Sequence, residues 1–152
     1  MGNMTYSKSG LALTESFEGV RPTAYQDVKG VWTIGYGHTL NVQPGDTCTP
    51  EQAEAWLAED IAWAVRVVNA FVQRTVTQGI FDALVDFTFN LGSGSLQHST
   101  LLMLVNQGNF AAAADEFQKW DHAGGVVVAG LLRRRIAEEQ EFQNDPPVAS
   151  NG

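Results

Sequence analysis

The sequence predicts an α+β fold, in which a small lobe built on a β-hairpin is joined by one long helix to a mainly helical lobe. Strand signals are confined to residues 23–41, which are rich in Gly, Tyr, Thr and Val. From residue 49 onward the apolar residues recur at helical spacing instead. This segregation is typical of α+β domains, because α/β folds alternate the two kinds of element along the chain.

The N-terminal part of the chain predicts a short helix followed by the hairpin. Residues 7–17 carry apolar side chains at helical spacing and are followed by Gly19, a common helix stop. Within 23–41, Asp27 and Gly30 occupy the first and fourth positions of a β-turn signal. We therefore expect one strand before this turn and one strand after it.

The long helix has the clearest start signal in the chain. Thr49 can cap it, Pro50 fits the first helical position, and Gln52 completes a capping box. Eight apolar side chains then form one broad arc: Ala53, Trp56, Leu57, Ile61, Ala64, Val65, Val68 and Phe71. Asp60 falls inside this arc, where an unpaired carboxylate would be costly, so we expect it to have a partner.

Helices are expected over the rest of the chain as well. A largely apolar helix is predicted over 77–91, and shorter ones near 100–106, 110–120 and 131–142, with glycines between them. Three aromatic residues at helical spacing are expected to be core residues and not carbohydrate platforms: Phe110, Phe117 and Trp120. The domain prediction is a single domain over residues 1–145, with a hairpin lobe at about 19–48, a helical lobe at about 77–143, and a loose tail at 146–152.

Composition and charge narrow the classes of partner. A chain of 152 residues with 44% apolar residues can build one compact domain with a substantial core. Seventeen acidic residues against nine basic ones give a net charge of −8, which argues against nonspecific nucleic-acid binding. For the one basic run, Arg133 to Arg135, we expect two of the three side chains to be solvated.

Several further features bear on the cellular setting. Cys48 is the only cysteine, so no internal disulfide can form, which suits a reducing cytoplasm. No run approaches the roughly 18 apolar residues of a membrane span, and the N-terminus lacks the apolar centre of a signal peptide. The His, Cys and Asp residues show no zinc-ligand spacing, so neither a metal nor another cofactor is expected.

The residues most suited to chemistry are Glu18, Asp27 and Thr33. Glu18 lies at the end of the first predicted helix, where the negative end of the helix dipole disfavours ionisation, as a general acid requires. Asp27 opens the turn and Thr33 follows on the returning strand, so little chain separates the three side chains. Two carboxyl groups held apart, with a hydroxyl that can handle water beside one of them, are the minimum for inverting hydrolysis of a glycosidic bond.

The same segment resembles a known family. Glu-Gly-x-Arg from Glu18, Asp27 nine residues on, and Thr33 within Gly-x-x-Thr-Ile-Gly-x-Gly-His are similar to the phage-type lysozymes, the endolysins of glycoside hydrolase family 24. The likeness continues through 49–66, Phe-Asn-Leu-Gly at 89–92, Ser-Thr-Leu at 99–101 and Gly-Leu-Leu-Arg-Arg-Arg at 130–135. It implies a lysozyme-like catalytic domain with an active-site cleft between the lobes.

The resemblance also implies the reaction and the residue roles. Glu18 would be the general acid, Asp27 would position or activate water, and Thr33 would assist with its hydroxyl. The bond cut would be the β-1,4 link between N-acetylmuramic acid and N-acetylglucosamine in peptidoglycan. Family membership implies inversion, for which the two carboxyl groups stand roughly 6.5–9.5 Å apart.

The resemblance assigns supporting residues as well. His38 matches the family histidine that pairs with an acid on the long helix, and Asp60 is the matching position. Four residues match positions that line the sugar-binding cleft: Thr39, Phe89, Asn90 and Thr100. Core packing is the alternative for Phe89, and helix capping is the alternative for Thr100 or its neighbour Ser99.

The expected partner is the glycan strand of peptidoglycan. The protein is expected to be a monomer that neither binds nucleic acid nor inserts into a membrane. The expected location is the host cytoplasm until a separate holin allows release to the periplasm and wall. Two other functions stay open at this stage. One is a lytic transglycosylase, against which Asp27 and Thr33 argue because both serve to manage water. The other is an inactive wall-binding module with a lysozyme fold.

Overall fold

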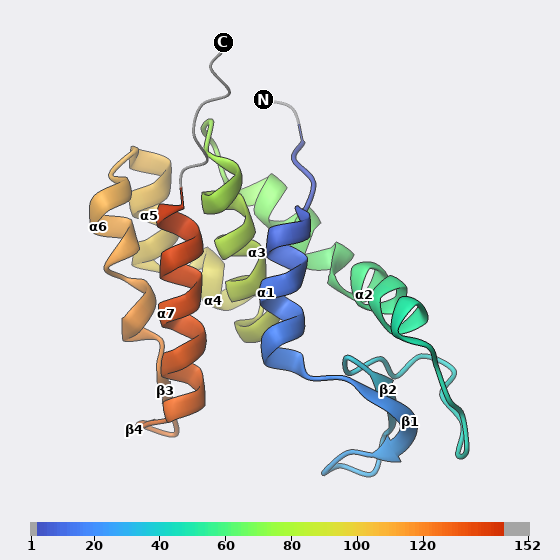
Figure 1. Cartoon of the computed structure of the whole chain (residues 1–152). Coiled ribbons are helices and arrows are strands. Elements are labelled where there is room, and N and C mark those ends of the chain that lie inside the picture. Colours follow the sequence, from blue (N-terminus) through green and yellow to red (C-terminus); the bar gives the residue numbers. More distant parts are fainter. Residues whose placement is uncertain (1–2, 145–152) are drawn as a thin grey trace. The chain divides into compact units, whose positions relative to one another are not determined.

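The structure is a computed structural model and describes residues 3–144 (Figure 1). The elements follow in this order: α1 (Lys8–Glu18), β1 (Arg21–Gln26), β2 (Trp32–Gly35), α2 (Pro50–Phe71), α3 (Gln78–Leu91), α4 (Ser93–Gln97), α5 (Thr100–Gln107), α6 (Phe110–Ala114), a 3₁₀ helix (Phe117–Lys119), β3 (His122–Ala123), β4 (Val126–Val127) and α7 (Ala129–Gln143). The predicted α+β class is confirmed. The tail predicted for 146–152 lies outside the described residues.

The chain divides into two compact units. The hairpin unit is Thr14–Trp63, and the helical unit is Met1–Leu13 together with Ala64–Gly152. Helices α1 and α2 each contribute residues to both units. None of the helices within residues 3–144 is long and apolar enough to cross a bilayer.

The hairpin unit is organised by the antiparallel pair β1–β2. Tyr25 lies opposite Thr33 and Gln26 opposite Trp32, whereas Arg21 pairs with Gly35 after a shift in register. The turn between the strands begins at Asp27, as the sequence predicts. A register that places Tyr25 opposite Thr33 puts their side chains on one face of the hairpin.

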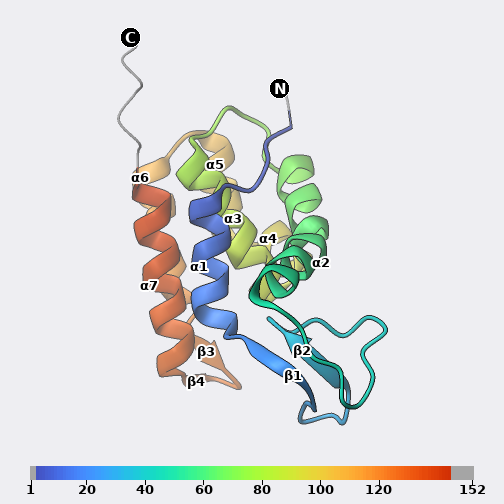
Figure 2. The same cartoon turned by 45° about the vertical axis from the view of Figure 1, so that its right-hand side comes forward.

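The helical unit is centred on α3. Every residue of α3 from Gly79 to Thr88 is buried, and α3 packs against α7, while α5 packs against α6 (Figure 2). The approach of α3 to the end of α7 depends on Gly79, because a Cβ there would lie 2.4 Å from the backbone oxygen of Glu141. The start of α3 is capped by Thr77, whose Oγ1 accepts a hydrogen bond from the N–H of Ile80 at 3.1 Å.

The segment predicted as one helix over 110–120 is broken in the structure. Helix α6 ends at Ala114, and a 3₁₀ helix follows in which the N–H of Trp120 bonds to the carbonyl of Phe117. Over so few residues the apolar spacing does not distinguish three from 3.6 residues per turn. Phe117 is nonetheless fully buried, as expected of a core residue.

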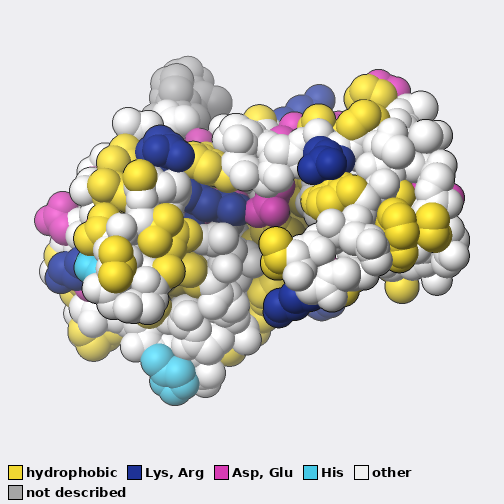
Figure 3. All heavy atoms as spheres, turned by 90° about the horizontal axis from the view of Figure 1, so that it is seen from below, with side chains coloured by type: hydrophobic (Ala, Val, Ile, Leu, Met, Phe, Trp, Pro, Cys, Tyr) yellow, Lys and Arg dark blue, Asp and Glu magenta, His cyan; other side chains and the backbone are white. Residues whose placement is uncertain are grey.

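Three short elements, one helix and two strands, were not predicted from the sequence. Helix α4 forms where Gly92 and Gly94 were read only as breaks between helices. Strands β3 and β4 form a small hairpin whose turn is Gly124-Gly125, and both glycines have positive φ, +59° and +81°. Figure 3 shows hydrophobic side chains gathered on the surface in the region of this hairpin, and Val126 and Val127 on β4 are 67% and 52% exposed.

The expectation that two of the three consecutive arginines are solvated is wrong. Arg133 is exposed, whereas Arg134 and Arg135 are 6% and 0% exposed. The cause lies in α3, whose fully buried Asp86 forms two hydrogen bonds with Arg134, Nε to Oδ2 at 2.9 Å and Nη2 to Oδ1 at 2.8 Å. Glu138 is buried beside Arg135 on the next turn of α7. We call Asp86, Arg134, Arg135 and Glu138 the buried ion cluster.

Candidate functional site

Glu18, Asp27 and Thr33 all belong to the hairpin unit. Glu18 is the last residue of α1 and is half-buried. Its Oε1 lies 3.9 Å from the position that a Cβ on Gly37 would occupy. The carboxyl group at the end of the helix therefore lies beside the turn that follows β2. Gly37 has φ +90°, a conformation that side-chain-bearing residues rarely adopt, so this turn requires glycine.

Asp27 is fixed by the backbone of the turn that it begins. Its Oδ1 accepts hydrogen bonds from the N–H groups of Lys29 and Val31 at 2.8 and 2.9 Å. Its own N–H donates to the carbonyl oxygen of Val31 at 2.9 Å. Among residues 3–144, no hydrogen bond is made by the second carboxylate oxygen, Oδ2. One carboxylate oxygen of Asp27 thus stabilises the turn, while the lone pairs of the other remain available to accept hydrogen bonds.

Thr33 is 4% exposed and its hydroxyl has a defined direction. Oγ1 donates to the carbonyl oxygen of Val31 at 2.9 Å, so its lone pairs remain as acceptors. Asp27 lies two residues beyond Tyr25, and Tyr25 is opposite Thr33 in the ladder. Asp27 and Thr33 are therefore diagonal neighbours on one face of the hairpin. Such an arrangement can hold one water molecule through a carboxylate oxygen and a hydroxyl oxygen.

The predicted partners His38 and Asp60 are in contact. His38 Nδ1 lies 2.8 Å from Asp60 Oδ2, and the histidine is 5% exposed. The imidazole also stacks on Trp56 of α2, with ring centroids 4.5 Å apart and planes 4° from parallel. The backbone of His38 bonds to Ile34 of β2 in both directions, at 2.8 and 2.9 Å. These contacts tie the residues after β2 to α2 within the hairpin unit.

The sequence analysis did not identify a pair of acidic residues in the same unit, Glu15 on α1 and Glu54 on α2. Loss of hydration, followed by the hydrogen bond to Glu54 and its negative charge, raises the pKa of Glu15 to about 7. Burial and the charges of Glu15 and Glu54 also raise the pKa of Tyr36. Glu15 lies three residues before Glu18 on α1, a spacing that brings two positions to one helix face. The spacing places Glu15 on the face of Glu18 but gives no sign of Glu54, which lies on α2. Groups with shifted pKa values concentrate at functional sites.

The residues predicted to line a sugar-binding cleft are divided between the units. Thr39 is exposed in the hairpin unit directly after His38. Phe89 and Asn90 are half-buried at the C-terminal end of α3 in the helical unit. Thr100 is exposed at the first position of α5, and the cap is its neighbour Ser99, whose Oγ accepts from the N–H of Leu102 at 3.0 Å. Their contacts with a substrate stay a prediction.

Comparisons of the sequence and of the structure with known proteins identify the same family. The phage lysozyme family profile matches residues 15–138. The endolysin of Acyrthosiphon pisum secondary endosymbiont phage 1 is 41% identical over 145 residues, covering 93% of this chain and 99% of that protein. The endolysin of Bacillus phage B103 is 44% identical over 142 residues, covering 91% of this chain and 54% of that protein, so the chain spans about half of its length.

A solved structure agrees with these relatives. The endolysin from Escherichia coli O157:H7 phage FAHEc1 superimposes with a TM-score of 0.86 at 36% identity, over 96% of this chain and 99% of that one. At this level of identity and coverage the shared fold reflects common descent, and the α+β architecture is lysozyme-like. The chain belongs to the phage lysozyme family.

Proposed function

We propose that the protein is an endolysin that hydrolyses the β-1,4 bond between N-acetylmuramic acid and N-acetylglucosamine in bacterial peptidoglycan. Family membership and the endolysin relatives support the coarser statement, a peptidoglycan hydrolase that serves cell lysis. The finer statement, an inverting acid–base mechanism, rests on the chemistry of the hairpin unit.

The observation that carries the proposal is the asymmetric use of Asp27. One oxygen of its carboxylate is held by two backbone N–H groups, and the other has no partner within residues 3–144. Thr33, on the same face, directs its hydroxyl proton to a carbonyl and keeps its lone pairs. Together they form an acceptor pair for an attacking water, while Glu18 donates the proton to the leaving oxygen. General-acid assistance of this kind contributes roughly 10²–10⁴-fold in rate.

The direct test is turnover of purified peptidoglycan by Glu18→Gln, read as released reducing ends. The amide keeps the shape of the side chain but donates no proton, so we expect a loss of at least about 10²-fold in kcat. The matched control is Glu59→Gln, the same chemical change at an exposed position on α2 in the same unit. Equal activity of the two variants would exclude Glu18 as the acid.

Product analysis separates the proposal from its rivals. Hydrolysis adds one water to each cleaved bond, whereas a lytic transglycosylase closes an anhydro sugar and adds none, so product mass distinguishes them. Inversion is read from the anomer formed first, which is α when the β-linked strand is cut by a single displacement. A protein that binds peptidoglycan without releasing any fragment would instead be a wall-binding module.

The setting of the reaction is part of the same proposal. The protein acts as a monomer, stays in the host cytoplasm during synthesis, and reaches the wall when a separate holin opens the membrane. Expression in a bacterial host should then leave cells intact until the membrane is permeabilised. Lysis without permeabilisation would contradict the need for a holin.

A further inference from the structure

Arg135 of α7 is held in one orientation by its surroundings. Its side chain is fully buried, with Nε 2.7 Å from Oε1 of Glu138 and Nη2 donating to Oε2 at 2.8 Å. Its guanidinium carbon also lies 5.4 Å from the ring centroid of Phe87. One hydrogen bond and one ion pair to the same carboxylate restrict the orientation of the guanidinium group.

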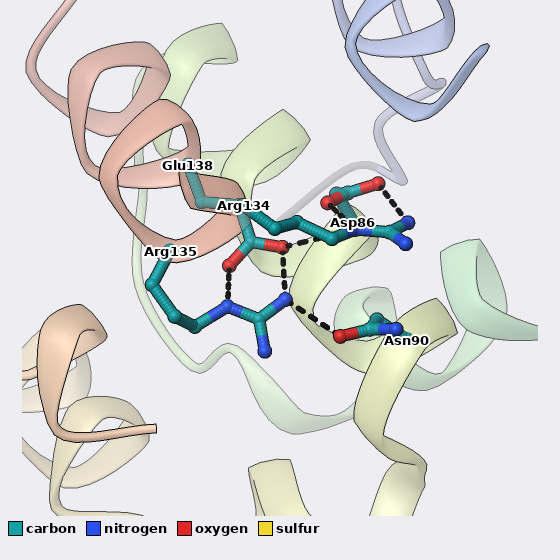
Figure 4. Close-up of polar contacts among 5 residues, drawn as sticks. All are labelled: Asp86, Asn90, Arg134, Arg135 and Glu138. Atoms are coloured by element: carbon teal, nitrogen blue, oxygen red, sulfur yellow. Dashed lines mark hydrogen bonds and ion pairs between the residues drawn. The ribbon is translucent and has the colours of Figure 1, made fainter. Parts of the chain in front are cut away.

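The same nitrogen makes a second contact, to the end of α3. Nη2 of Arg135 donates to Oδ1 of Asn90 at 2.8 Å, as Figure 4 shows. Arg135, Glu138 and Asn90 all belong to the helical unit. A residue predicted to contact substrate is therefore joined directly to the buried ion cluster.

This contact decides which way the Asn90 amide faces. A guanidinium group has only donors, so the atom turned toward Arg135 must be the amide oxygen. A flipped amide would bring two N–H donors together and lose a charge-assisted hydrogen bond. In Figure 4 the nitrogen Nδ2 lies on the side away from Arg135. Nδ2 makes no hydrogen bond to the residues that the structure describes, and Asn90 is half-buried, so water or a ligand can reach it.

We propose that Arg135 is a positioning residue that makes Asn90 an obligate hydrogen-bond donor, and that this donor binds an acyl carbonyl oxygen of the peptidoglycan strand. The inference rests on the proposed function and adds the polarity of one contact. Such a carbonyl belongs either to an N-acetyl group on a sugar or to the stem peptide. A fixed donor favours these groups over the ammonium that remains after a sugar is de-N-acetylated, because an ammonium only donates.

The test uses Asn90→Asp, which changes one group of the side chain. The carboxylate still accepts from Arg135 but presents an oxygen where Nδ2 stood. Affinity is measured by sedimentation with insoluble peptidoglycan in the Glu18→Gln background, and KM and kcat are measured in the otherwise wild-type enzyme. Loss of one neutral hydrogen bond is expected to raise Kd and KM about 2- to 12-fold while kcat stays constant. The melting temperature should not fall.

The control for added charge is Gln97→Glu, at an exposed position on α4 of the same unit. It should leave Kd unchanged. The positioning role is read from Arg135→Met, in which Asn90 is free to flip. An amide that is free to flip can still donate, but only about half of its orientations present Nδ2 to the ligand, so Arg135→Met should raise Kd about 2-fold with kcat unchanged, and Arg135→Lys should restore part of the loss. A merely structural Arg135 would lower the melting temperature without raising Kd.

Two substrates identify the carbonyl. If Asn90 binds the N-acetyl group, the rise in Kd caused by Asn90→Asp should persist on glycan strands stripped of stem peptides and disappear on a de-N-acetylated wall. If Asn90 binds the peptide, the rise should disappear on the stripped strands and persist on the de-N-acetylated wall. An unchanged Kd for Asn90→Asp on intact peptidoglycan would overturn the inference, and so would a penalty that survives both substrate changes. Because binding is measured without turnover, a wild type that fails to hydrolyse would refute the proposed function and still leave this result readable.

Discussion

Arg133, Arg134 and Arg135 offer an internal comparison, because three identical side chains in a row have different surroundings. Arg134→Met removes a guanidinium that is 7% exposed and paired through two hydrogen bonds with Asp86, whose side chain is 0% exposed. Methionine is long enough to fill much of the space but offers no donor. Asp86 then remains in the core without its bidentate partner. Breaking a buried pair in this way costs about 3–5 kcal/mol of unfolding free energy.

Thermal unfolding is the assay, with Arg133→Met as the control. For a domain of this size each kcal/mol shifts Tm by about 2–4 °C, so Arg134→Met should lower Tm by about 6–20 °C. Arg133 is exposed, and the same change there should stay within about 0.5 kcal/mol of wild type. Both variants lose one positive charge, so a difference between them reports burial and pairing and not net charge.

A double variant separates pairing from volume. Replacing both members of a buried pair by apolar residues is often neutral or stabilising, so Arg134→Met combined with Asp86→Leu should recover most of the lost Tm. Equal Tm values for Arg134→Met and Arg133→Met would refute the reasoning. A double variant no more stable than Arg134→Met would show that the buried carboxylate is not the source of the loss.

Three other perturbations follow from local geometry. Asp60→Asn weakens the 2.8 Å contact with the buried histidine and, because Asp60 is 34% exposed, should cost only about 1–2 kcal/mol by urea unfolding, with kcat little changed. The pKa of Glu15 is raised to about 7 from 4.5, so stability should fall as pH rises between these values, and Glu15→Gln should raise Tm relative to wild type at pH 8 but not at pH 4. Gly79→Ala would place a Cβ 2.4 Å from the backbone of α7 and should cost about 1–3 kcal/mol, whereas Gly94→Ala, with nothing within 4 Å, should be neutral or stabilising.

The hairpin could be predicted because its determinants are local. Asp27 and Gly30 specify the turn, and the turn sets the register that brings Thr33 to the face of Asp27. Thr33 follows Glu18 by only 15 positions in the printed sequence, so few arrangements of the intervening chain are available. The determinants of the long helix are equally local, because Pro50 and the capping box mark its start and the apolar arc marks its buried face.

What the sequence did not reveal depends on contacts between distant segments. Asp86 and Arg134 are 48 residues apart, so no motif of fixed spacing joins them. The short pieces α4 and β3–β4 were missed for a different reason. Each has five residues or fewer, so its periodicity is shorter than any window that could reveal it.

A usable signal for the buried ion cluster was nevertheless present in α3. From Gly79 to Phe87 its sequence, Gly-Ile-Phe-Asp-Ala-Leu-Val-Asp-Phe, is apolar except for two aspartates. A helix that is apolar all round is buried, and a buried carboxylate must be paired with a cation or hydrogen-bonded, as Asp82 is by Ser7 and Gln78. The one basic run in the sequence, Arg133 to Arg135, lies in a separate predicted helix. At least one of its arginines was therefore the natural partner for a buried aspartate of α3. Counting buried acids before assigning the arginines to solvent would have predicted the pair, because the cost of an uncompensated charge exceeds any preference of arginine for water.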